Sequence, residues 1–265
     1  MLLIDLIPFL KENSKNVKIH FAKGYYNPED ALRSYLMGDF KQFQDNQGNK
    51  NFERDYILPL IRLGNGEWLF AGIYRSFGCR TIKEGRKTWY KYRTKLIEDG
   101  AELEGRVIVG FKRTFRQSYC CLESFEDALE VLEVRRSEYN LPFPGYDKVC
   151  LTWEELYTVI DTEEWKKPLL NRKGVYLITD MSNGKMYVGS ATGRSKLWRR
   201  WKSYIETGHG GNKDLKKLSK KHIRENFQYT ILESYTPSIE DAEIRKKEQW
   251  WKEVLKTKEF GYNEN

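Results

Sequence analysis

The chain has 265 residues, a length that suits two ordinary domains better than one. It contains 46 Lys and Arg against 38 Asp and Glu, has a net charge of +8 and a pI near 9.1, and 14% of its residues are aromatic. This composition excludes a disordered chain and makes nucleic acid the first partner to test, while the lack of any apolar run of about 18 residues predicts a soluble, cytoplasmic protein without a membrane span.

The first part of the chain predicts a β-rich domain with flanking helices. Met1–Leu10 predicts an opening helix. From Trp68 to Tyr119, β-branched and aromatic residues are interrupted by glycines at strand-and-turn spacing, which predicts a small β-barrel or curled sheet. Apolar residues in Ser124–Ser137 recur at helical spacing and predict a helix that closes this domain. Pro142, Pro144 and Gly145 then predict a turn at Leu141–Tyr146.

The domain boundary is expected in the polar stretch Thr162–Asn171, which contains Pro168 and follows a short helix predicted at Thr152–Ile160. We therefore expect a domain at residues 1–165 and a second at residues 172–265. The overall fold class is α+β: a β-barrel-like domain with flanking helices, followed by a small α/β sandwich.

The second domain begins with a predicted β-hairpin. Its strands are Val175–Asp180 and Lys185–Ser190, joined through Asn183-Gly184, which is a strong hairpin signal. The elements predicted after the hairpin are helices at about Ser195–Thr207, Lys213–Glu225 and Ser238–Lys256, with a strand near Gln228–Glu233 between the last two.

Alternation along these strands places two phenols on one face. Tyr176, Ile178 and Asp180 fall on the same face as Tyr187 and Gly189 when the turn has an even length. Because Gly189 has no side chain, we expect room there for a substrate group to approach the backbone. Two strand tyrosines packed in a core are the alternative, since tyrosine favours strands.

The helix after the hairpin carries an arginine at the margin of its apolar face. That face is formed by Leu197, Trp198, Trp201, Tyr204 and Ile205. At 100° per residue, Arg199 falls opposite this face and is expected in solvent, whereas Arg200 lies at its edge, one turn before Tyr204. A guanidinium held against the domain suits a bidentate phosphate contact, and a snorkelling arginine is the alternative.

The last helix carries a carboxylate on its apolar face. Ile244, Trp251 and Leu255 mark the face, and Glu248 falls on the same line. A buried carboxylate must be paired or bind a cation, and Mg²⁺ is commonly held by one carboxylate, waters and a substrate phosphate. An ion pair with Arg200 or a lysine is the competing explanation.

Two further sets of basic residues are candidate DNA contacts. A run on the middle helix is typical of a solvated face, but in a nuclease it would follow the phosphate backbone; it consists of Lys213, Lys216, Lys217, Lys220 and Lys221. The N-terminal domain alternates basic and aromatic residues in 89–93 and 111–116, which suits a β-surface that stacks bases; its candidates are Trp89, Arg93, Arg113 and Arg116. Barrel core is the alternative for these aromatics. A cluster near one barrel mouth could also hold a flipped or modified base, and its expected members are Trp68, Phe70, Trp89 and Tyr92.

These motifs occur in a familiar order. Gly174-Val175-Tyr176, Tyr187-Val188-Gly189, Arg200, Glu248 and Asn263 have the order and spacing of the GIY-YIG nuclease superfamily, which the chain resembles over roughly Arg172–Asn265. The segments 187–191 and 200–202 resemble phage homing endonucleases of this family in particular. Gly72-Ile73-Tyr74 repeats the first triplet, but no second triplet follows it across a turn, so we interpret it as an ordinary barrel strand.

The resemblance implies hydrolysis of a phosphodiester bond in double-stranded DNA with one Mg²⁺ or Mn²⁺ ion per active site. It implies that Tyr176 is the general base, Tyr187 a second active-site phenol, Arg200 the phosphate contact, Glu248 the metal ligand and Asn263 a supporting hydrogen-bond group. Many family members have a histidine one turn after the arginine, where this chain has Tyr204. The group that takes the proton from Tyr176 is therefore open between Lys185, His209 and a metal-bound hydroxide.

The sequence thus predicts a metal-dependent DNA endonuclease of the restriction or phage-defence type, with an N-terminal domain that selects the DNA and could read modified bases. A homing-type endonuclease, a repair enzyme and a catalytically inactive DNA-binding protein are the alternatives. One catalytic centre per chain cuts one strand at a time, so double-strand cleavage would need a homodimer on DNA or two successive events.

Overall fold

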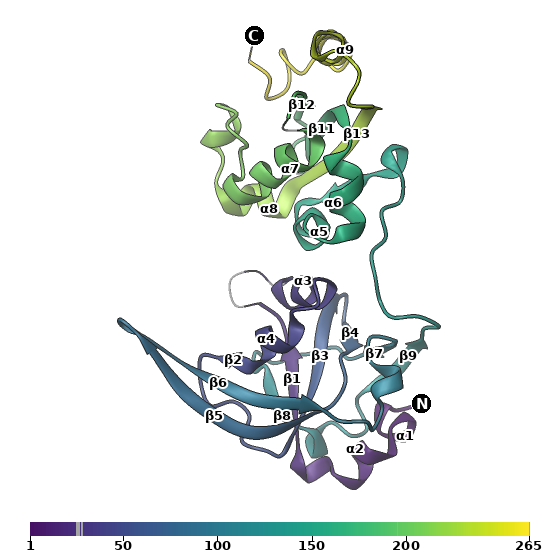
Figure 1. The fold of residues 1–265 in the computed structure, drawn as a ribbon, viewed down its shortest axis with the longest axis vertical. Helices are drawn as coiled ribbons and strands as arrows, with labels where there is room; N and C mark the ends of the chain where they lie inside the picture. The colour runs from purple at the N-terminus through teal and green to yellow at the C-terminus, as the bar shows by residue number, and fades with distance from the viewer. Residues whose placement is uncertain (25–26, 28, 195, 265) are drawn as a thin grey trace. The chain divides into compact units, whose positions relative to one another are not determined.

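The computed structural model describes residues 1–24, 27, 29–194 and 196–264, and the chain divides into two compact units, Met1–Asn140 and Leu141–Asn265 (Figure 1). Ser195 and Asn265, which bounded two of the expected segments, lie outside the described residues. We call the two units the N-terminal unit and the C-terminal unit. Each has its own buried apolar core.

The N-terminal unit combines short helices with a large sheet. Its helical segments are α1 (Leu3–Leu6), α2 (Pro8–Glu12), η1 (Ser14–Asn16), α3 (Asp30–Leu36), α4 (Phe40–Asp45), η2 (Ala101–Leu103) and η3 (Leu122–Ser124). Its strands are β1 (Val17–Ala22), β2 (Asn46–Gln47), β3 (Tyr56–Gly64), β4 (Glu67–Phe70), β5 (Tyr74–Glu84), β6 (Lys87–Leu96), β7 (Val107–Gly110), β8 (Tyr119–Cys121) and β9 (Glu130–Val134). The opening helix is divided in two because Pro8, which has no backbone N–H, can only begin a new helix.

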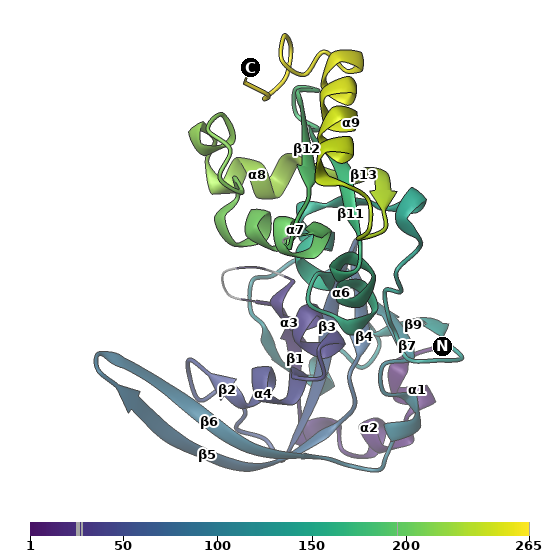
Figure 2. The same cartoon turned by 45° about the horizontal axis from the view of Figure 1, so that its top comes forward.

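The sheet is open, which corrects the expected barrel. Its order is β2-β6-β5-β3-β4-β7-β9, with β1 parallel to β3 and antiparallel to β8. A barrel requires its first and last strands to pair, and within the described residues β2 and β9 do not. Strands β5 and β6 instead extend away from the sheet as a long two-stranded hairpin, which we call the ribbon (residues 74–96; Figures 1 and 2).

The helix expected at Ser124–Ser137 is wrong. The segment contains η3 and then β9, which pairs antiparallel with β7. Of the apolar residues that suggested the helix, Leu129 is buried but Leu132 is 52% exposed. Two β-branched residues, Val131 and Val134, favour a strand in Glu130–Val134, and the free edge of β7 decides the outcome by supplying backbone partners.

The aromatic mouth expected in this unit does not form. Trp68 and Phe70 are buried in the main core, whereas Tyr92 is buried in a separate cluster with Phe52, and Trp89 is only half-buried on the ribbon. The Gly72-Ile73-Tyr74 triplet joins β4 to β5, where Ile73 is fully buried. Residues 111–118 form no strand, so the alternating surface expected there is also absent from the described residues.

The C-terminal unit has a four-stranded antiparallel sheet in the order β10-β13-β11-β12. Its strands are β10 (Cys150–Thr152), β11 (Lys173–Asp180), β12 (Met186–Ala191) and β13 (Phe227–Tyr235). Its helical segments are η4 (Tyr146–Lys148), α5 (Trp153–Val159), α6 (Glu163–Leu170), α7 (Lys196–Thr207), η5 (Leu215–Lys217), α8 (Lys220–Asn226) and α9 (Asp241–Val254). The predicted order of hairpin, helices, strand and last helix is present.

The C-terminal unit begins before the boundary expected at Thr162–Asn171. That stretch contains α6, whose Trp165 and Leu169 are buried in the same core as Tyr176. Because the outer side of α6 is polar, the composition of Thr162–Asn171 resembles that of a linker. Helix α5 belongs to the same core and begins with a capping box in which the Thr152 hydroxyl accepts a hydrogen bond from Glu155 N.

The middle helix is shorter than expected. Residues 213–225 divide into η5 and α8, because the Ser219 hydroxyl caps α8 by accepting a hydrogen bond from His222 N at 3.1 Å. Within the ranges that the structure describes, no helix combines the length and apolar character needed to cross a membrane.

Candidate active site

The hairpin formed by β11 and β12 brings the two phenols together. Tyr176 lies opposite Gly189, and Ile178 lies opposite Tyr187, so both tyrosines face the same side of the sheet, as the alternation predicts. Tyr176 is fully buried and Tyr187 is 8% exposed. Their ring centroids are 6.5 Å apart.

Gly189 is required by the phenols themselves. A Cβ at this position would stand 2.4 Å from the Tyr176 hydroxyl oxygen and 2.9 Å from the Tyr187 ring, distances that real Cβ atoms do not tolerate. The room expected for a substrate group above Gly189 is therefore filled by Tyr176. The glycine permits the tyrosine to lie flat across the strand.

Helix α7 directs Arg200 into this cluster. The Nε of Arg200 donates a hydrogen bond of 2.8 Å to the Tyr176 hydroxyl, and Nη1 donates one of 2.8 Å to the Gly210 carbonyl. The guanidinium also lies over the Tyr204 ring, 5.1 Å from its centroid. Arg199 is exposed, as predicted. Arg200 is thus held in one orientation by contacts that leave its Nη2 group for another partner.

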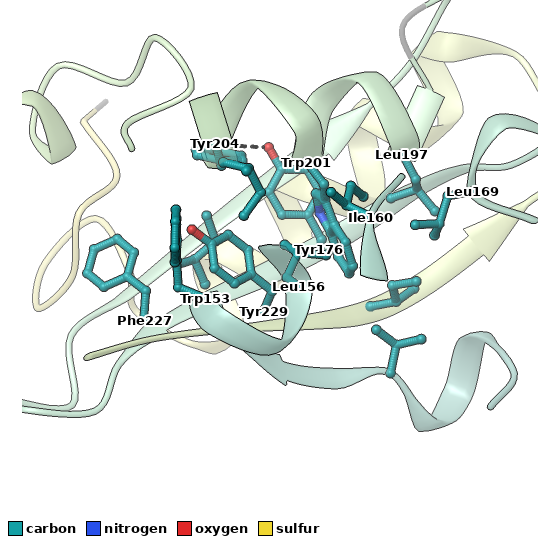
Figure 3. Packing of buried hydrophobic residues seen from close by; sticks show 14 of the residues in the cluster. Trp153, Leu156, Ile160, Leu169, Tyr176, Leu197, Trp201, Tyr204, Phe227 and Tyr229 are labelled. Carbon is teal, nitrogen blue, oxygen red and sulfur yellow. Dashed lines mark hydrogen bonds between the residues drawn. The ribbon is translucent and has the colours of Figure 1, made fainter. Parts of the chain in front are cut away.

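Tyr204 completes the cluster. Its hydroxyl is 3.0 Å from that of Tyr176, and the dashed line in Figure 3 joins the two oxygens. The surrounding walls are aromatic, with Trp201 on the same helix and Tyr229 on β13 (Figure 3). The other proton acceptors considered from the sequence make different contacts: Lys185 lies over the Tyr262 ring, and His209 Nδ1 accepts from Gly211 N.

Burial dominates the electrostatics of the cluster. It raises the pKa of Tyr176 well above the usual range, and the Tyr187 phenol adds to the effect, while the Arg200 guanidinium opposes it. Burial likewise raises the pKa of Tyr204. Burial alone would lower the pKa of Arg200, but the effect of the phenols is larger. The pKa of Arg200 is therefore raised, and its guanidinium is charged at neutral pH. In the free protein a charged arginine therefore sits among protonated phenols.

Glu248 lies on the opposite face of the hairpin. Helix α9 packs there through Ile244, which is buried with Val175 and Val188. The Glu248 side chain is 14% exposed, accepts a hydrogen bond from the Ser190 hydroxyl and forms a salt bridge with Lys252 Nζ at 2.6 Å. The lysine pair that we considered as the competing explanation is therefore present, and the partner is Lys252.

The two faces meet at one stretch of the edge strand β12. Gly189 lies under the phenols, whereas the next residue, Ser190, bonds to Glu248. Adjacent strand residues point to opposite faces, so the arginine cluster and the carboxylate lie on either side of the Gly189-Ser190 step.

The segment after α9 covers the preceding part of the same edge. Tyr262 N donates to the Met186 carbonyl at 2.8 Å. The Asn263 amide accepts from Val188 N and donates to Val188 O, both at 2.8 Å. Asn263 thus replaces a missing neighbouring strand and fixes the position of β12 just before Gly189.

A buried carboxylate fixes the hairpin turn. Asp180 is fully buried and accepts hydrogen bonds from the Ser182 hydroxyl at 2.6 Å and the Tyr262 hydroxyl at 2.7 Å, and it lies 2.7 Å from His222 Nε2. Burial alone would raise the pKa of Asp180, but these bonds outweigh it and lower the pKa to about 2. Asp180 therefore ties the hairpin to α8 and to the segment that carries Asn263.

The donor set at Glu248 fits a divalent cation. Each carboxylate oxygen has one partner, and a carboxylate has about four acceptor positions, so capacity remains. Among the described residues no group of three or more His, Cys, Asp or Glu could hold a metal ion together. One carboxylate with waters and a phosphate is an arrangement that Mg²⁺ accepts, and Mn²⁺ takes similar oxygen ligands. Lys252 would compete with the cation.

The lysines proposed to follow DNA are all exposed. Three of them already pair with acidic side chains: Lys213 with Glu264, Lys217 with Asp214 and Lys221 with Glu225. Lys216 lies on η5 and Lys220 on α8, so the run is not one helical face.

The N-terminal candidates differ from one another. Trp89 and Arg93 lie on the ribbon, and Arg93 is exposed, with its guanidinium 5.2 Å from the Phe77 ring. Arg113 is half-buried, and its guanidinium lies 5.7–5.9 Å from the rings of Phe21, Trp68 and Phe115. Arg116 is exposed in the loop after β7.

Sequence reasoning missed several residues of the site. Lys252 is one helical turn from Glu248, and this i, i+4 spacing is visible in the sequence. Ser190 and Gly210 carry no such signal, because their roles depend on contacts between distant elements. At Gly210, with φ 55°, a Cβ would stand 2.4 Å from the Tyr204 ring.

Residues 172–263 match a protein-family model described as the GIY-YIG catalytic domain. Intron-associated endonuclease 1 of Enterobacteria phage T4 is 36% identical over 92 residues, which are 35% of this chain and 36% of the relative. The chain therefore matches about a third of the length of that curated relative.

Two solved structures also match. A variant of the catalytic domain of intron endonuclease I-TevI is 33% identical, with 35% of this chain and 92% of that chain covered, and a TM-score of 0.29. The catalytic domain of homing endonuclease I-TevI is 34% identical, with 35% and 98% covered, and the same TM-score.

Proposed function

We propose, from the premise that residues 172–263 form a GIY-YIG catalytic domain, that this chain is a metal-dependent DNA endonuclease whose N-terminal unit selects the DNA. A GIY-YIG catalytic domain implies a phosphodiester-hydrolysing endonuclease. The observation that carries the proposal is the placement of Arg200 and Glu248 on either side of the Gly189-Ser190 step.

Arg200 is the proposed phosphate contact. Its Nε and Nη1 are fixed by Tyr176 and Gly210, so its Nη2 group can contact a phosphate oxygen without loss of side-chain entropy on binding. In the described residues Arg200 has no salt bridge to a carboxylate. Its charge is therefore available to the negative charge that develops on the phosphate during hydrolysis.

Tyr176 is the proposed general base, and the Tyr204 hydroxyl, 3.0 Å away, is the proposed hydrogen-bond partner that orients it. Because burial raises the pKa of Tyr176, the phenol keeps its proton at neutral pH in the free protein. The base therefore needs a second positive charge besides Arg200 when DNA is bound. Tyr187, which is slightly exposed, is the proposed phenol nearest to the substrate.

Glu248 is the proposed ligand of Mg²⁺ or Mn²⁺, one ion per site. Bound here, the ion would supply positive charge to the scissile phosphate and lower the pKa of a water. The Ser190 hydroxyl holds one carboxylate oxygen in place. Asn263 is a positioning residue, because it fixes the strand that carries Ser190 and contacts neither Arg200 nor Glu248 in the described structure.

The ribbon is the proposed duplex-binding element of the N-terminal unit. Lys87, Lys91, Arg93 and Lys95 are exposed at alternate positions of β6, which place them on one face with Trp89. Across the ribbon, Arg80 lies opposite Lys91, and Arg75 lies opposite Lys95. A two-stranded β-ribbon fits the major groove of B-DNA, and this face supplies charges for the phosphates beside it.

The salt dependence of DNA binding tests the ribbon. Replacing Lys91 and Arg93 with alanine should reduce the slope of log affinity against log salt by about 2, since each lost phosphate contact accounts for about 0.9. The matched control replaces Lys11 and Lys15, which are exposed cations of the same unit outside the ribbon. An equal change in the control would show a general charge effect and reject the ribbon.

The proposed biological role is restriction or phage defence, in which the N-terminal unit reads a DNA feature that includes modified bases. A homing-type endonuclease is the second candidate, because the curated relative is named as intron-associated. Digestion of plasmid, phage and methylated genomic DNA, followed by sequencing of the ends, separates the two. Frequent or modification-dependent cuts support restriction, whereas one rare site supports homing.

Nicking of plasmid DNA tests the activity itself. The full chain should nick or cut DNA in Mg²⁺ or Mn²⁺ and stop when EDTA is added. Binding of DNA without cleavage in either ion would identify a catalytically inactive DNA-binding protein. Cleavage that persists in EDTA would reject the metal at Glu248. Analytical ultracentrifugation with and without DNA would test the proposed homodimer on DNA.

A further inference from the structure

The N-terminal unit contains a cavity of about 530 Å³ near the root of the ribbon. Its walls come from β1, α3, α4, β2 and β8, and the residues that matter below are His20, Lys23, Phe43, Asn46, Gln47 and Tyr119. The volume falls within the range of roughly 300–1,000 Å³ that is typical of small-molecule sites. None of these residues belongs to the catalytic domain.

The cavity has a flat aromatic wall. His20 and Tyr119 stack with ring centroids 5.0 Å apart and planes inclined by 13°. Phe52 packs edge-on against both rings, at 5.4 and 5.6 Å. The Tyr119 hydroxyl donates a hydrogen bond to Gln47, which prevents the ring from turning. A fixed ring face of this kind suits the stacking of a planar ligand.

One polar atom of a cavity-lining residue lacks a partner. His20 is 3% exposed, and its Nδ1 has no hydrogen bond to any described residue. Burial lowers the pKa of His20 to about 4, although the Gln44 amide opposes this, so the imidazole is neutral near pH 7. A neutral imidazole offers one donor and one acceptor. A ligand with a complementary polar edge would relieve the cost of leaving His20 Nδ1 unpaired.

One cation and one carboxylate, Lys23 and Asp39, line the cavity. Burial lowers the pKa of Lys23, and the guanidiniums of Arg113 and Arg62 lower it further. Of these two guanidiniums, that of Arg62 is paired with Glu29 at 2.5 Å. On the other side, Asn46 and Gln47 of β2 pair with Lys91 and Tyr90 of the ribbon. A duplex held by the basic face of the ribbon would therefore pass beside the cavity, where Lys23 can contact a phosphate.

We propose that this cavity binds a single nucleobase of the DNA substrate, turned out of the helical stack, with its ring against Tyr119, its polar edge at His20, and its phosphate at Lys23. The inference rests on the proposed function, because it requires DNA as the substrate. It names the part of the N-terminal unit that would distinguish one base, or one modified base, from another. A base can enter such a cavity only after it leaves the duplex.

Gly48 offers a way to block the cavity without disturbing the core. It lines the cavity, its φ lies outside the left-handed region, and a Cβ there would meet nothing within 4 Å. Gly48→Tyr should therefore fold and fill the space. Asn49→Tyr is the matched control, since it adds the same ring at the next exposed position, which does not line the cavity. His20→Ala is less informative because His20 is buried and its loss could unfold the unit.

The first experiment measures binding of deoxynucleoside 5′-monophosphates to the full chain in EDTA by calorimetry or ligand-detected NMR. The panel contains the four standard bases and 5-methylcytosine, 5-hydroxymethylcytosine and N6-methyladenine, with deoxyribose 5-phosphate as the baseless control. At least one nucleotide should bind about tenfold more tightly than the control, and Gly48→Tyr but not Asn49→Tyr should abolish the difference. Equal binding of all nucleotides and deoxyribose 5-phosphate would overturn the proposal.

The second experiment uses a duplex with one mismatched base, which costs less to extrude than a paired base. The full chain should bind it several-fold more tightly than the matched duplex, and Gly48→Tyr should remove that preference. An unchanged preference in Gly48→Tyr would place any extruded base elsewhere and reject the cavity. Neither measurement depends on cleavage, so a nucleobase site could stand even if the nuclease proposal failed, and the reverse is also true.

Discussion

The two faces of β12 carry side chains of opposite charge. The cation on one face has only neutral partners, whereas the carboxylate on the other face has a charged partner. On one face, Arg200 is held by neutral groups, namely the hydroxyl of Tyr176 and the carbonyl of Gly210. On the other face, the charge of Glu248 is already compensated by Lys252 at 2.6 Å. The guanidinium thus keeps its full charge, while the carboxylate is largely neutralised by its own helix.

This difference indicates the order in which the candidate site can be filled. Before DNA arrives, the net field at the Gly189-Ser190 step is positive, because one uncompensated cation lies beside one ion pair. A phosphate is attracted to such a field, whereas a divalent cation is attracted only after the phosphate has added negative charge. We therefore expect DNA and the metal ion to bind cooperatively at this step.

The largest expected effect comes from the carboxylate face. Glu248→Ala should abolish cleavage in Mg²⁺ while DNA binding survives, because the variant removes the only proposed metal ligand. Glu253→Ala, an exposed carboxylate on the same helix, is the control and should cleave normally. If Glu248→Ala still nicks plasmid in Mg²⁺, the metal assignment is wrong.

The second-largest effect is expected on the face of β12 that carries Arg200. Arg200→Ala should lower the cleavage rate by about 10²-fold or more, the loss expected when one contact to a developing anion is removed. The neighbouring Arg199 is exposed, so Arg199→Ala controls for general loss of positive charge. Single-turnover rates at saturating enzyme separate this loss from weaker binding, and an unchanged rate would return Arg200 to a structural role.

Replacement of the Tyr176 phenol should lower the cleavage rate by about 10²-fold, which is near the lower end of the rate contribution of a general base. The comparison is Tyr176→Phe with Tyr229→Phe, since Tyr229 is equally buried but its hydroxyl has no partner among the described residues. Because the pKa of Tyr176 is raised in the free protein, the fraction of phenolate grows with pH, and the wild-type rate should rise about tenfold per pH unit until the pKa of Tyr176 in the DNA-bound enzyme is reached. A rate that does not change with pH from mildly acidic to mildly alkaline solution would exclude Tyr176 as the titrating base.

The smallest effect should come from the ion pair on the carboxylate face. Lys252→Met keeps the aliphatic stem but removes the charge that compensates Glu248. The Mg²⁺ concentration that gives half-maximal cleavage should fall several-fold, and the dependence of metal binding on DNA should weaken. A higher Mg²⁺ requirement would mean that Lys252 positions Glu248 rather than competing for it.

The sequence predicted the C-terminal unit better than the N-terminal unit for a physical reason. Tyr176 and Tyr187 could be placed because strand alternation and a short turn fix their faces locally, and Arg200 and Glu248 because helical periodicity fixes theirs. The N-terminal sheet depends on long-range pairing: β1 lies parallel to β3, nearly forty residues later. No local pattern distinguishes an open sheet from a barrel, and a local apolar period at Leu129 suggested a helix where the edge of β7 imposes a strand.

The same limit explains what was missed around the sites. Ser190, Gly210 and the pair of Asp180 with His222 act through residues far apart in the sequence. The cavity at His20 and Tyr119 joins residues about a hundred positions apart, and it replaces the aromatic mouth expected from Trp68, Phe70, Trp89 and Tyr92.

Coverage of the β12 edge by residues 261–263 has a consequence for newly made chains. These residues follow every strand and helix of their unit, so the ribosome delivers them after the rest of the unit has emerged. Until then Met186 and Val188 present free backbone groups, and the strand that carries Gly189 and Ser190 is not held in register. The N-terminal unit is complete well before that moment. On the proposed assignment of DNA selection to the N-terminal unit, the candidate active site is therefore completed only after the unit that selects the DNA has formed.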